Sequence, residues 1–268
     1  MTIHTIGDSH SCSGWYGVIE HHLGSILCYT FGKEKLNRCD IRNFNIEDGD
    51  TIIFCLGEID CRCHIHKHVN ETIVYQDIIN NIIDNYFEAI ELNVTTSQLK
   101  LKNIYIYNIV PPIQIKNTLE NPAYPFLGSD EERKTYVLYF NKKLKEKCIE
   151  HNFIFFDIYD NYVDKNGFLR KDLSDGAVHI KNGIYINNYV NKNIQRTLRC
   201  KIKYGISNNN IDVTQICLSK CIINNILTIP KGDFARSDIF SDPLPNVLKS
   251  IFLEYDDRQE ITIDLHMT

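Results

Sequence analysis

Apolar residues gather in five short runs within the first 160 residues, and longer segments between them repeat apolar positions at helical spacing. Short apolar runs bounded by Gly, Pro, Asn or Asp are typical of strands, and apolar positions three and four residues apart are typical of amphipathic helices. Alternation of the two indicates right-handed crossovers and a mostly parallel sheet, so we predict a three-layer α/β/α domain. The predicted strands are 2–6, 25–31, 51–56, 103–110 and 153–158, and the predicted helices are 15–20, 70–92, 129–150 and 181–197.

The pattern changes at about residue 201. Short strand-like pieces follow, separated by turns rich in Asn, Gly, Asp and Pro; they are 202–205, 211–214, 226–230 and 250–255. We therefore predict two domains, residues 1–200 and a small all-β appendage at 201–268. For the appendage, a role in packing or oligomerisation is favoured over glycan or partner binding. The chain could therefore form a homo-oligomer.

The composition of the chain excludes several classes of function and indicates a compartment. The 268 residues carry a net charge of −5 with a pI near 6.1, which argues against nucleic acid as the main partner. No apolar run is long enough for a membrane span, and the N-terminus lacks the pattern of a secretory signal. Ten cysteines without such a signal indicate reduced thiols, so we expect a cytoplasmic protein. The absence of a Gly-x-Gly-x-x-Gly or Walker loop predicts no nucleotide cofactor.

The most informative stretch is 2–11, in which an apolar-biased strand breaks at Gly7-Asp8-Ser9. Gly7 allows a tight turn, and the Asp8 carboxylate can bond the backbone of that turn. A serine at the carboxyl end of a parallel strand lies where open α/β sheets gather their chemistry. Its Oγ is exposed there, and nearby backbone N–H groups can stabilise an oxyanion. The tripeptide is also common in ordinary turns, so a nucleophilic role for Ser9 needs a second motif.

That second motif is a loop in which Asp175 and His179 lie four residues apart. A nucleophilic serine needs a base, and the base needs an orienting acid. At these two motifs the chain resembles the SGNH (GDSL-type) hydrolase family over roughly residues 1–200. The resemblance implies a flavodoxin-like fold with Ser9 as nucleophile, His179 as general base and Asp175 as its partner. The loop has one residue more than the family spacing, which leaves Asp172 as an alternative acid.

A third stretch, residues 57–60, follows the central strand where the family carries Gly-x-Asn-Asp. In the family the Asn side chain donates to the oxyanion, but Ile59 stands in its place here and can donate nothing. Loss of one such donor costs about 3 kcal/mol, or roughly 10²–10³ in rate. Gly57, the first residue of this block, joins the candidates for oxyanion or substrate binding.

Other groups could supply donors to the oxyanion or the substrate. The resemblance points to the Ser9 backbone N–H and to Gly32, which follows the predicted second strand. Arg62 and His64 come after the central strand and could bind a carboxylate or sugar hydroxyls. Asp8 lies beside the nucleophile. The long loop 113–129 is a natural wall for a substrate at this edge of the sheet.

The segment 61–68 holds two cysteines and three histidines, which are potential zinc ligands. Its spacing does not match the Cys-x₂-Cys pairs of structural zinc sites, and no second cluster follows, so lining of the active site is the favoured interpretation and no metal is predicted. Cys12 is a weaker candidate nucleophile than Ser9 because it falls at the predicted helix start. The pair His21-His22 is predicted near the end of the first helix, and His4 within the first strand.

Two functions from different classes remain. The first is a serine-dependent esterase or O-acyltransferase that acts through an acyl-enzyme on a small ester, with O-acetylated carbohydrate as the best substrate class. The second is a non-catalytic or weakly active carbohydrate-binding protein on the same scaffold. Ile59 and the lengthened His179 loop support the second function. The agreement of motifs at both ends of the domain favours the enzyme.

Overall fold

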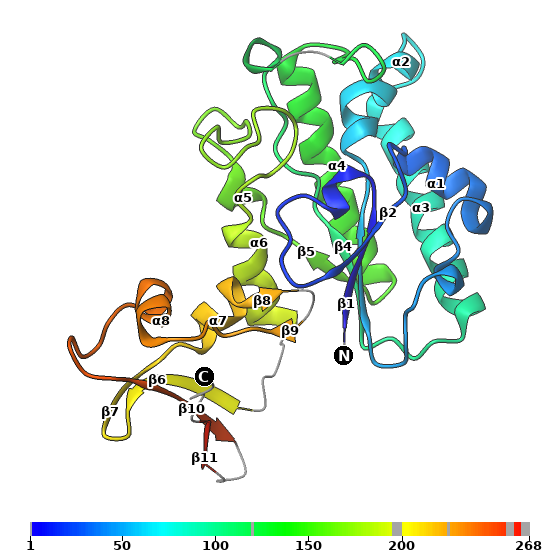
Figure 1. Cartoon of the computed structure of the whole chain (residues 1–268). Coiled ribbons are helices and arrows are strands. Elements are labelled where there is room, and N and C mark those ends of the chain that lie inside the picture. Colours follow the sequence, from blue (N-terminus) through cyan, green and yellow to red (C-terminus); the bar gives the residue numbers. More distant parts are fainter. Residues whose placement is uncertain (1, 119–120, 195–199, 224–225, 256–259, 264–268) are drawn as a thin grey trace. The chain divides into compact units, whose positions relative to one another are not determined.

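The computed structural model describes residues 2–118, 121–194, 200–223, 226–255 and 260–263 (Figure 1). The chain divides into two compact units, Met1–Ile186 and Asn187–Thr268, and the division falls within helix α6 (Ile184–Tyr189). The domain boundary predicted after residue 200 stays a prediction.

A parallel five-stranded sheet forms the centre of the first unit. Its strand order is β2-β1-β3-β4-β5, and every neighbouring pair is parallel. The carboxyl ends of the strands therefore share one edge, which confirms the predicted α/β architecture. The strands are β1 (Ile3–Gly7), β2 (Ile19–His22), β3 (Thr51–Cys55), β4 (Asn103–Tyr107) and β5 (Ile154–Phe156).

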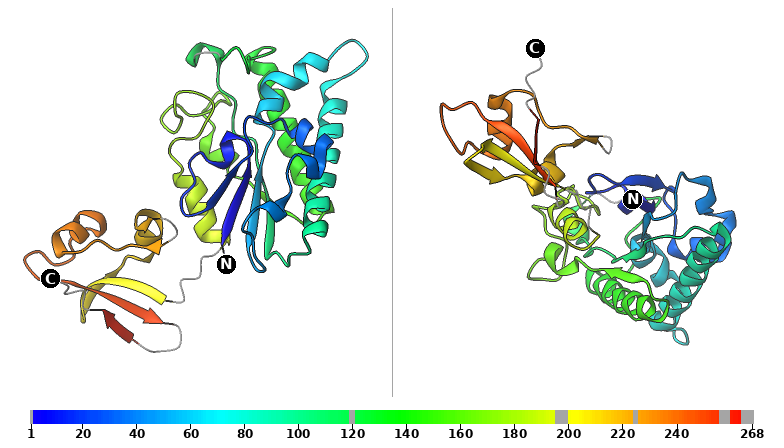
Figure 2. Two further views of the ribbon diagram at one scale, coloured as in Figure 1. Left: turned by 45° about the vertical axis from the view of Figure 1, so that its right-hand side comes forward. Right: turned by 90° about the horizontal axis from the view of Figure 1, so that it is seen from below.

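Helices cover both faces of this sheet, with α1, α3 and α4 on one face and α5 and α6 on the other (Figures 1 and 2). The α-helices of the unit are α1 (Cys28–Glu34), α2 (Ile65–His68), α3 (Tyr75–Ser97), α4 (Asp130–Glu150) and α5 (Tyr159–Tyr162). Short 3₁₀ turns and one π-helical segment complete it, namely η1 (Ser9–Ser11), η2 (Lys35–Asn37), η3 (Ile41–Asn43), η4 (Asp60–His64) and η5 (Ile115–Asn117).

The two faces of the central strand pack differently. Ile52 and Phe54 belong to the large apolar core under α1, α3 and α4. The opposite face is covered by an aromatic group, in which Trp15 contacts Tyr107 and Phe156 with ring centroids 5.2 and 5.3 Å apart. Burial on both faces is the reason why the central strand is a continuous apolar run rather than an alternating one.

The N-termini of α1 and α4 are fixed by acceptor side chains. The fully buried Asp60 carboxylate accepts from the backbone N–H groups of Cys28 at 2.6 Å and Tyr29 at 3.0 Å, which α1 leaves without intrahelical acceptors. At α4, Ser129 and Glu132 form a capping box, so the helix predicted over 129–150 is confirmed. Asp60 thereby ties the segment after β3 to the segment after β2.

The region between β1 and β3 corrects two predictions. Residues 15–20 are not a helix, because Ile19–His22 form the edge strand β2, and His21 and His22 therefore lie on a strand. Residues 25–31 are not a strand, because the helix α1 begins at Cys28. The edge strand is largely exposed and carries no apolar alternation, whereas the short apolar run 25–31 packs as a buried helix. Periodicity cannot separate a short strand from a short buried helix.

Two further helices differ from their predicted bounds. The helix predicted from residue 70 is α3, which begins at Tyr75. Asn70 lies in a turn before α3, where its side chain accepts from the backbone N–H groups of Thr72 and Ile73. The predicted closing helix 181–197 is divided into α6 and the π-helical η6 (Val190–Ile194), and its residues 195–197 lie outside the described residues.

The second unit contains a small antiparallel sheet, as predicted, in the order β11-β10-β6-β7. After residue 200 its described part also contains the helices α7 and α8, where the sequence indicated only strands and turns, so it is not all-β. Its core includes Ile202, Tyr204, Phe240 and Ile251. The elements are β6 (Cys200–Ile206), β7 (Asn209–Asp212), α7 (Thr214–Lys220), β8 (Ile222–Ile223), β9 (Ile226–Leu227), α8 (Asp233–Phe240), β10 (Ser250–Tyr255) and β11 (Glu260–Ile263).

Candidate active site

Ser9 lies directly after β1, at the sheet edge where the strands end. A side chain at Gly7 is excluded, because a Cβ there would lie 2.0 Å from the carbonyl oxygen of Cys55 on β3. The Asp8 carboxylate caps the following turn by accepting from the backbone N–H of His10 at 2.9 Å. Ser9 is the first residue of η1, and the turn itself leaves its backbone N–H without an acceptor. That N–H is therefore available to an oxyanion.

His179 joins the serine to a carboxylate. Its Nε2 lies 2.8 Å from Oγ of Ser9, and its Nδ1 lies 2.8 Å from Oδ2 of Asp175. A Ser–His–Asp chain of hydrogen bonds allows the imidazole to take the serine proton while the carboxylate orients the ring. The structure thus brings together the three residues that the two sequence motifs pointed to.

The Asp175 loop is held by its own backbone. Oδ1 of Asp175 accepts from the N–H of Ala177 at 2.7 Å and of His179 at 3.3 Å. Burial by itself raises the pKa of Asp175, but the hydrogen bonds from His179 and from these amides outweigh it and hold the pKa below its usual value. The carboxylate therefore stays ionised beside the imidazole. The additional residue in the loop does not prevent the contact.

Asp172, the alternative acid, has another partner. Its carboxylate forms a two-pronged ion pair with Arg170, at 3.2 Å to Nε and 2.6 Å to Nη2. The pair is at the surface, and the hydrogen bond from Arg170 lowers the pKa of Asp172. Asp172 is thus engaged away from the His179 ring.

A pocket of about 260 Å³ opens beside Oγ of Ser9. Its walls come from five parts of the chain: the β1 turn, the segment after β2, the segment after β3, the long loop that was predicted as a substrate wall and the loop that carries His179. Most of the wall is apolar or aromatic, with a few polar groups. The lining residues are Ser9, Ser25, Ile59, Arg62, Thr118, Asn121, Tyr124, Phe126, Ala177, Val178 and His179.

Arg62 lines this pocket, but its guanidinium already binds other groups. It forms a two-pronged ion pair with Glu58, at 2.7 and 3.0 Å, and donates to the backbone carbonyl of Tyr124 at 2.5 Å. Its guanidinium carbon also lies 5.5 Å from the centre of the Phe126 ring. Arg62 therefore fastens the long loop to the segment after β3. These three hydrogen bonds use three of the five guanidinium N–H groups, and the other two take no part in them.

Three predicted binding residues lie elsewhere. Gly32 is in the middle of α1, packed against the backbone of α3 near Asn85, so it does not line the pocket. His64 stacks on Tyr29 and on His68, with ring centroids 4.8 and 4.6 Å apart, and is likewise absent from the lining. Gly57 occupies a left-handed conformation at φ +119°, packed against Ile109 and Phe140.

Sequence reasoning missed the segment after β2. Since β2 ends at His22, the residues that reach the sheet edge there are Gly24 and Ser25, and Ser25 lines the pocket. Because the second strand was predicted at 25–31, its carboxyl end was expected at Gly32 rather than at Gly24 and Ser25. A signal was present in the Gly24-Ser25 pair, which is a turn signature before the apolar run.

Two other candidate groups, Cys12 and the segment 61–68, are also described in the structure. Burial raises the pKa of the Cys12 thiol, which keeps it protonated and disfavours it as the nucleophile. The predicted Cys–His segment 61–68 forms η4 and α2, and among the described residues no group of three or more His, Cys, Asp or Glu side chains is arranged to hold a metal ion. In the described part of the chain, no helix is long and apolar enough to cross a membrane.

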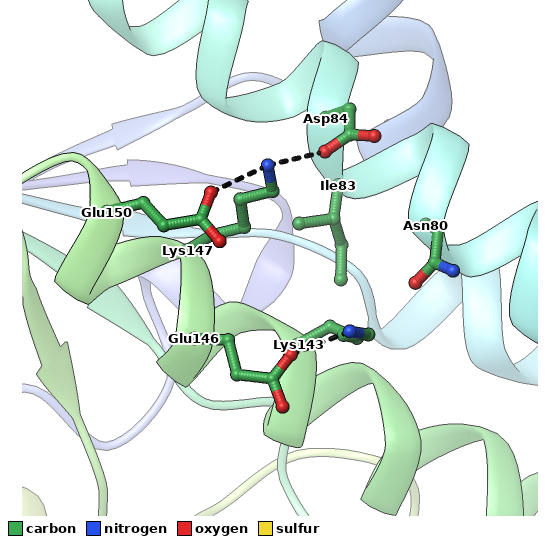
Figure 3. A pocket seen from close by; sticks show the side chains of 7 residues that line it. All are labelled: Asn80, Ile83, Asp84, Lys143, Glu146, Lys147 and Glu150. Carbon is green, nitrogen blue, oxygen red and sulfur yellow. Dashed lines mark hydrogen bonds and ion pairs between the residues drawn. The ribbon is translucent and has the colours of Figure 1, made fainter.

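A second hollow, of about 250 Å³, lies between α3 and α4 (Figure 3). Its two lysines are each engaged in ion pairs: Lys147 pairs with Asp84 and Glu150, both at 2.9 Å, and Lys143 pairs with Glu146 at 2.6 Å. Such exposed pairs contribute little stability. The residues that line this hollow include no serine, threonine, cysteine or histidine.

Comparisons with known proteins agree on the fold. No protein-family model and no curated protein sequence matches the chain. A Streptococcus pneumonia protein described as a candidate platelet activating factor is similar in structure at 17% identity, with a TM-score of 0.51, over 72% of this chain and 84% of the other. A likeness at this identity shows the fold alone, and it confirms the predicted three-layer architecture.

Two further solved structures are described as GDSL proteins. A GDSL-like lipase from Bacteroides thetaiotaomicron matches at 12% identity and TM-score 0.47, over 70% of this chain and 84% of the other. A lipolytic protein of the G-D-S-L family from Veillonella parvula matches at 15% identity and TM-score 0.47, over 73% and 99%.

Proposed function

We propose that this chain is a serine-dependent ester hydrolase of the SGNH type. The proposal rests on one observation, the pair of 2.8 Å hydrogen bonds that join Ser9, His179 and Asp175 in series at the mouth of a pocket. The arrangement combines a nucleophile, a base within reach of its proton and an acid that orients the base.

The reaction proceeds in two steps on this geometry. Oγ of Ser9 attacks the acyl carbonyl as its proton passes to Nε2 of His179, and the imidazolium is stabilised by the Asp175 carboxylate. The same proton then goes to the departing alkoxide, which leaves as an alcohol. In the second step His179 takes a proton from water as the hydroxide attacks the acyl-Ser9 ester, and the imidazolium then gives this proton to the departing Oγ, so that the acid is released and both Ser9 and His179 are restored.

The oxyanion has fewer side-chain donors than the family pattern supplies. The Ser9 backbone N–H is one donor, and Ser25, which follows β2, also lines the pocket. Ile59 lines the pocket where the family has its Asn and contributes only apolar surface. We therefore expect a slower enzyme than one with all three donors, by roughly 10²–10³ in rate.

The pocket favours a small acyl group. Its volume of about 260 Å³ is at the low end for small-molecule sites, and its wall combines the rings of Tyr124 and Phe126 with the polar side chains of Thr118 and Asn121. An aromatic face with a few hydrogen-bonding groups suits a sugar that carries an O-acetyl ester. The same acyl-enzyme would pass its acyl group to a sugar hydroxyl if the acceptor outcompetes water.

Chain length of the acyl group tests this account. Initial rates are measured with p-nitrophenyl acetate, butyrate and octanoate and with an O-acetylated oligosaccharide, using Ser9→Ala as the control. We expect the fastest turnover with acetate, a steep decline towards octanoate, release of acetate from the oligosaccharide, and none of these with Ser9→Ala. A preference for octanoate would contradict the small-acyl assignment, and no turnover by the folded parent would contradict the esterase.

Ile59 favours a second candidate function, a carbohydrate-binding protein with little or no catalysis, because the missing donor weakens the oxyanion site more than the binding wall. It differs from the esterase in one measurement. A pure binding protein would bind an acetylated oligosaccharide equally well as parent and as Ser9→Ala and release no acetate, whereas the esterase releases acetate only as the parent.

A further inference from the structure

His10, the residue after the nucleophile, has two polar partners on opposite sides of its ring. Nδ1 lies 3.1 Å from Oδ1 of Asp8, and Nε2 lies 3.2 Å from the backbone carbonyl oxygen of Val178. The His10 ring is only 5% exposed and lies 5.1 Å, centroid to centroid, from the ring of His179. His10 is absent from the pocket lining, so it touches the machinery without facing the substrate.

The chemistry of these partners fixes the protonation of the ring. A peptide carbonyl only accepts, so Nε2 must carry a proton. Oδ1 of Asp8 already accepts from the His10 backbone N–H, and a bare Nδ1 would place its lone pair against that carboxylate oxygen. Nδ1 must therefore carry a proton as well. The geometry is satisfied by an imidazolium between a carboxylate and a carbonyl.

The electrostatic surroundings agree. Burial by itself lowers the pKa of His10, but Asp8, the more distant Glu58 and the Val178 carbonyl outweigh it and raise this pKa to about 9. Among the other titratable groups, His179 lies beside the ring, and Cys55 and Tyr107 line a small hollow together with His10. Burial raises the pKa of both Cys55 and Tyr107, so neither is charged at neutral pH. At neutral pH the ring therefore keeps both protons.

We propose that His10, as an imidazolium, is a positioning residue that fastens the Val178 carbonyl, and with it the His179 loop, to the Asp8 carboxylate at the nucleophile turn. This inference rests on the proposed function, since it concerns the alignment of Ser9 with its base. Val178 immediately precedes His179, so a shift of its carbonyl moves the imidazole. A misplacement of about 1 Å in such a site costs roughly 100-fold in rate.

Two amide variants separate the two bonds of the clamp. In His10→Gln the longer side chain places an N–H near the former Nε2 and keeps the bond to Val178. In His10→Asn the shorter one places it near the former Nδ1 and keeps only the bond to Asp8. The clamp predicts that the rate of fluorophosphonate labelling of Ser9 falls roughly 10- to 100-fold in His10→Asn and His10→Ala, and that His10→Gln recovers a large part of it. A merely structural role would make Gln and Asn equivalent.

The protonation state is measured on the parent protein by the ¹⁵N resonances of the His10 ring. We expect both ring nitrogens to be protonated at pH 7.5, with labelling declining only as the ring loses a proton near pH 9. A neutral ring at pH 7.5, or unchanged labelling in both His10→Asn and His10→Ala, overturns the proposal. If the parent takes no label, the esterase is wrong, while the ring resonances still decide the clamp; they also decide it if a variant fails to fold.

Discussion

The His179 ring lies between Ser9, 2.8 Å from its Nε2, and Asp175, 2.8 Å from its Nδ1, although the serine is separated from the imidazole by 170 positions in the chain. Two loops at one edge of the sheet create this contact. The turn after β1 presents the hydroxyl, and the Asp175–His179 loop presents acid and base together.

Asp175 is expected to orient the imidazole, because it accepts from Nδ1 of His179. Asp175→Asn should lower kcat/KM for p-nitrophenyl acetate by roughly 10²–10⁴, since an amide in this place favours the wrong ring tautomer. Asp172→Asn is the matched control, because its partner is Arg170, and it should stay within about twofold of the parent. Equal losses in both variants would remove Asp175 from its assigned role.

Ile59 occupies the pocket wall where the related family has an oxyanion donor. Ile59→Asn should raise kcat for p-nitrophenyl acetate by at least about tenfold, out of the roughly 10²–10³ that one donor contributes. The change also places an amide at a residue that is 3% exposed, so the free energy of unfolding should fall by about 1–3 kcal/mol. Ile59→Val keeps the apolar character and serves as the control. A folded Ile59→Asn with parental kcat would show that the amide does not reach the oxyanion.

Asp60 is expected to be a stability residue rather than a catalytic one. Asp60→Ala leaves two backbone N–H groups at the start of α1 buried without their acceptor and should lower the free energy of unfolding by about 3 kcal/mol. Burial raises the pKa of Asp60 to about 7, so the contribution of Asp60 to stability falls as the pH rises towards that value, and urea unfolding is therefore measured at pH 6, below the pKa. The exposed Asp172, which pairs with Arg170 at the surface, provides the control, and Asp172→Ala should change stability by less than about 1 kcal/mol. Equal effects would contradict the buried cap.

The stability contributed by His10 should depend on pH in a defined direction. Its pKa is about 9 in the folded protein against 6.5 for the unperturbed group, so the native state binds the proton more tightly. The contribution is complete below about pH 6.5 and disappears as the pH rises through about 9. Unfolding free energies of the parent and of His10→Gln should therefore differ most at pH 6, and the difference should shrink by at most about 3 kcal/mol by pH 10. A gap that widens with pH would reverse the assignment.

Much of the site could be predicted because its chemistry is local in sequence. Gly7-Asp8-Ser9 forms one turn, and the acid and base share one loop, so residue type and spacing were sufficient to nominate them. The parallel sheet could be predicted from strands such as Thr51–Cys55, because a strand that is buried along its whole length is mostly apolar. Helix α4 could be bounded because Ser129 and Glu132 are a capping pair that acts over one turn.

The features that could not be predicted depend on contacts between distant parts of the chain. The exposed edge strand Ile19–His22 has no apolar alternation, so the pattern did not reveal it. Because of that error the prediction omitted the pocket residue Ser25 and named Gly32 as a binding residue, although Gly32 lies in a helix. The bond from His10 to the Val178 carbonyl joins segments 168 positions apart, and no local pattern announces it. Cytoplasmic location, a homo-oligomer and the role of the second unit stay predictions.

Covalent labelling of Ser9 tests the central claim most directly. The folded parent, Ser9→Ala and His179→Ala are treated with a fluorophosphonate probe, and the modified residue is located by mass spectrometry. The account predicts one phosphonylated residue in the parent, Ser9, and no label in either variant, because an ordinary serine without a base does not react. A folded parent without label, or a label that persists in Ser9→Ala, would contradict it.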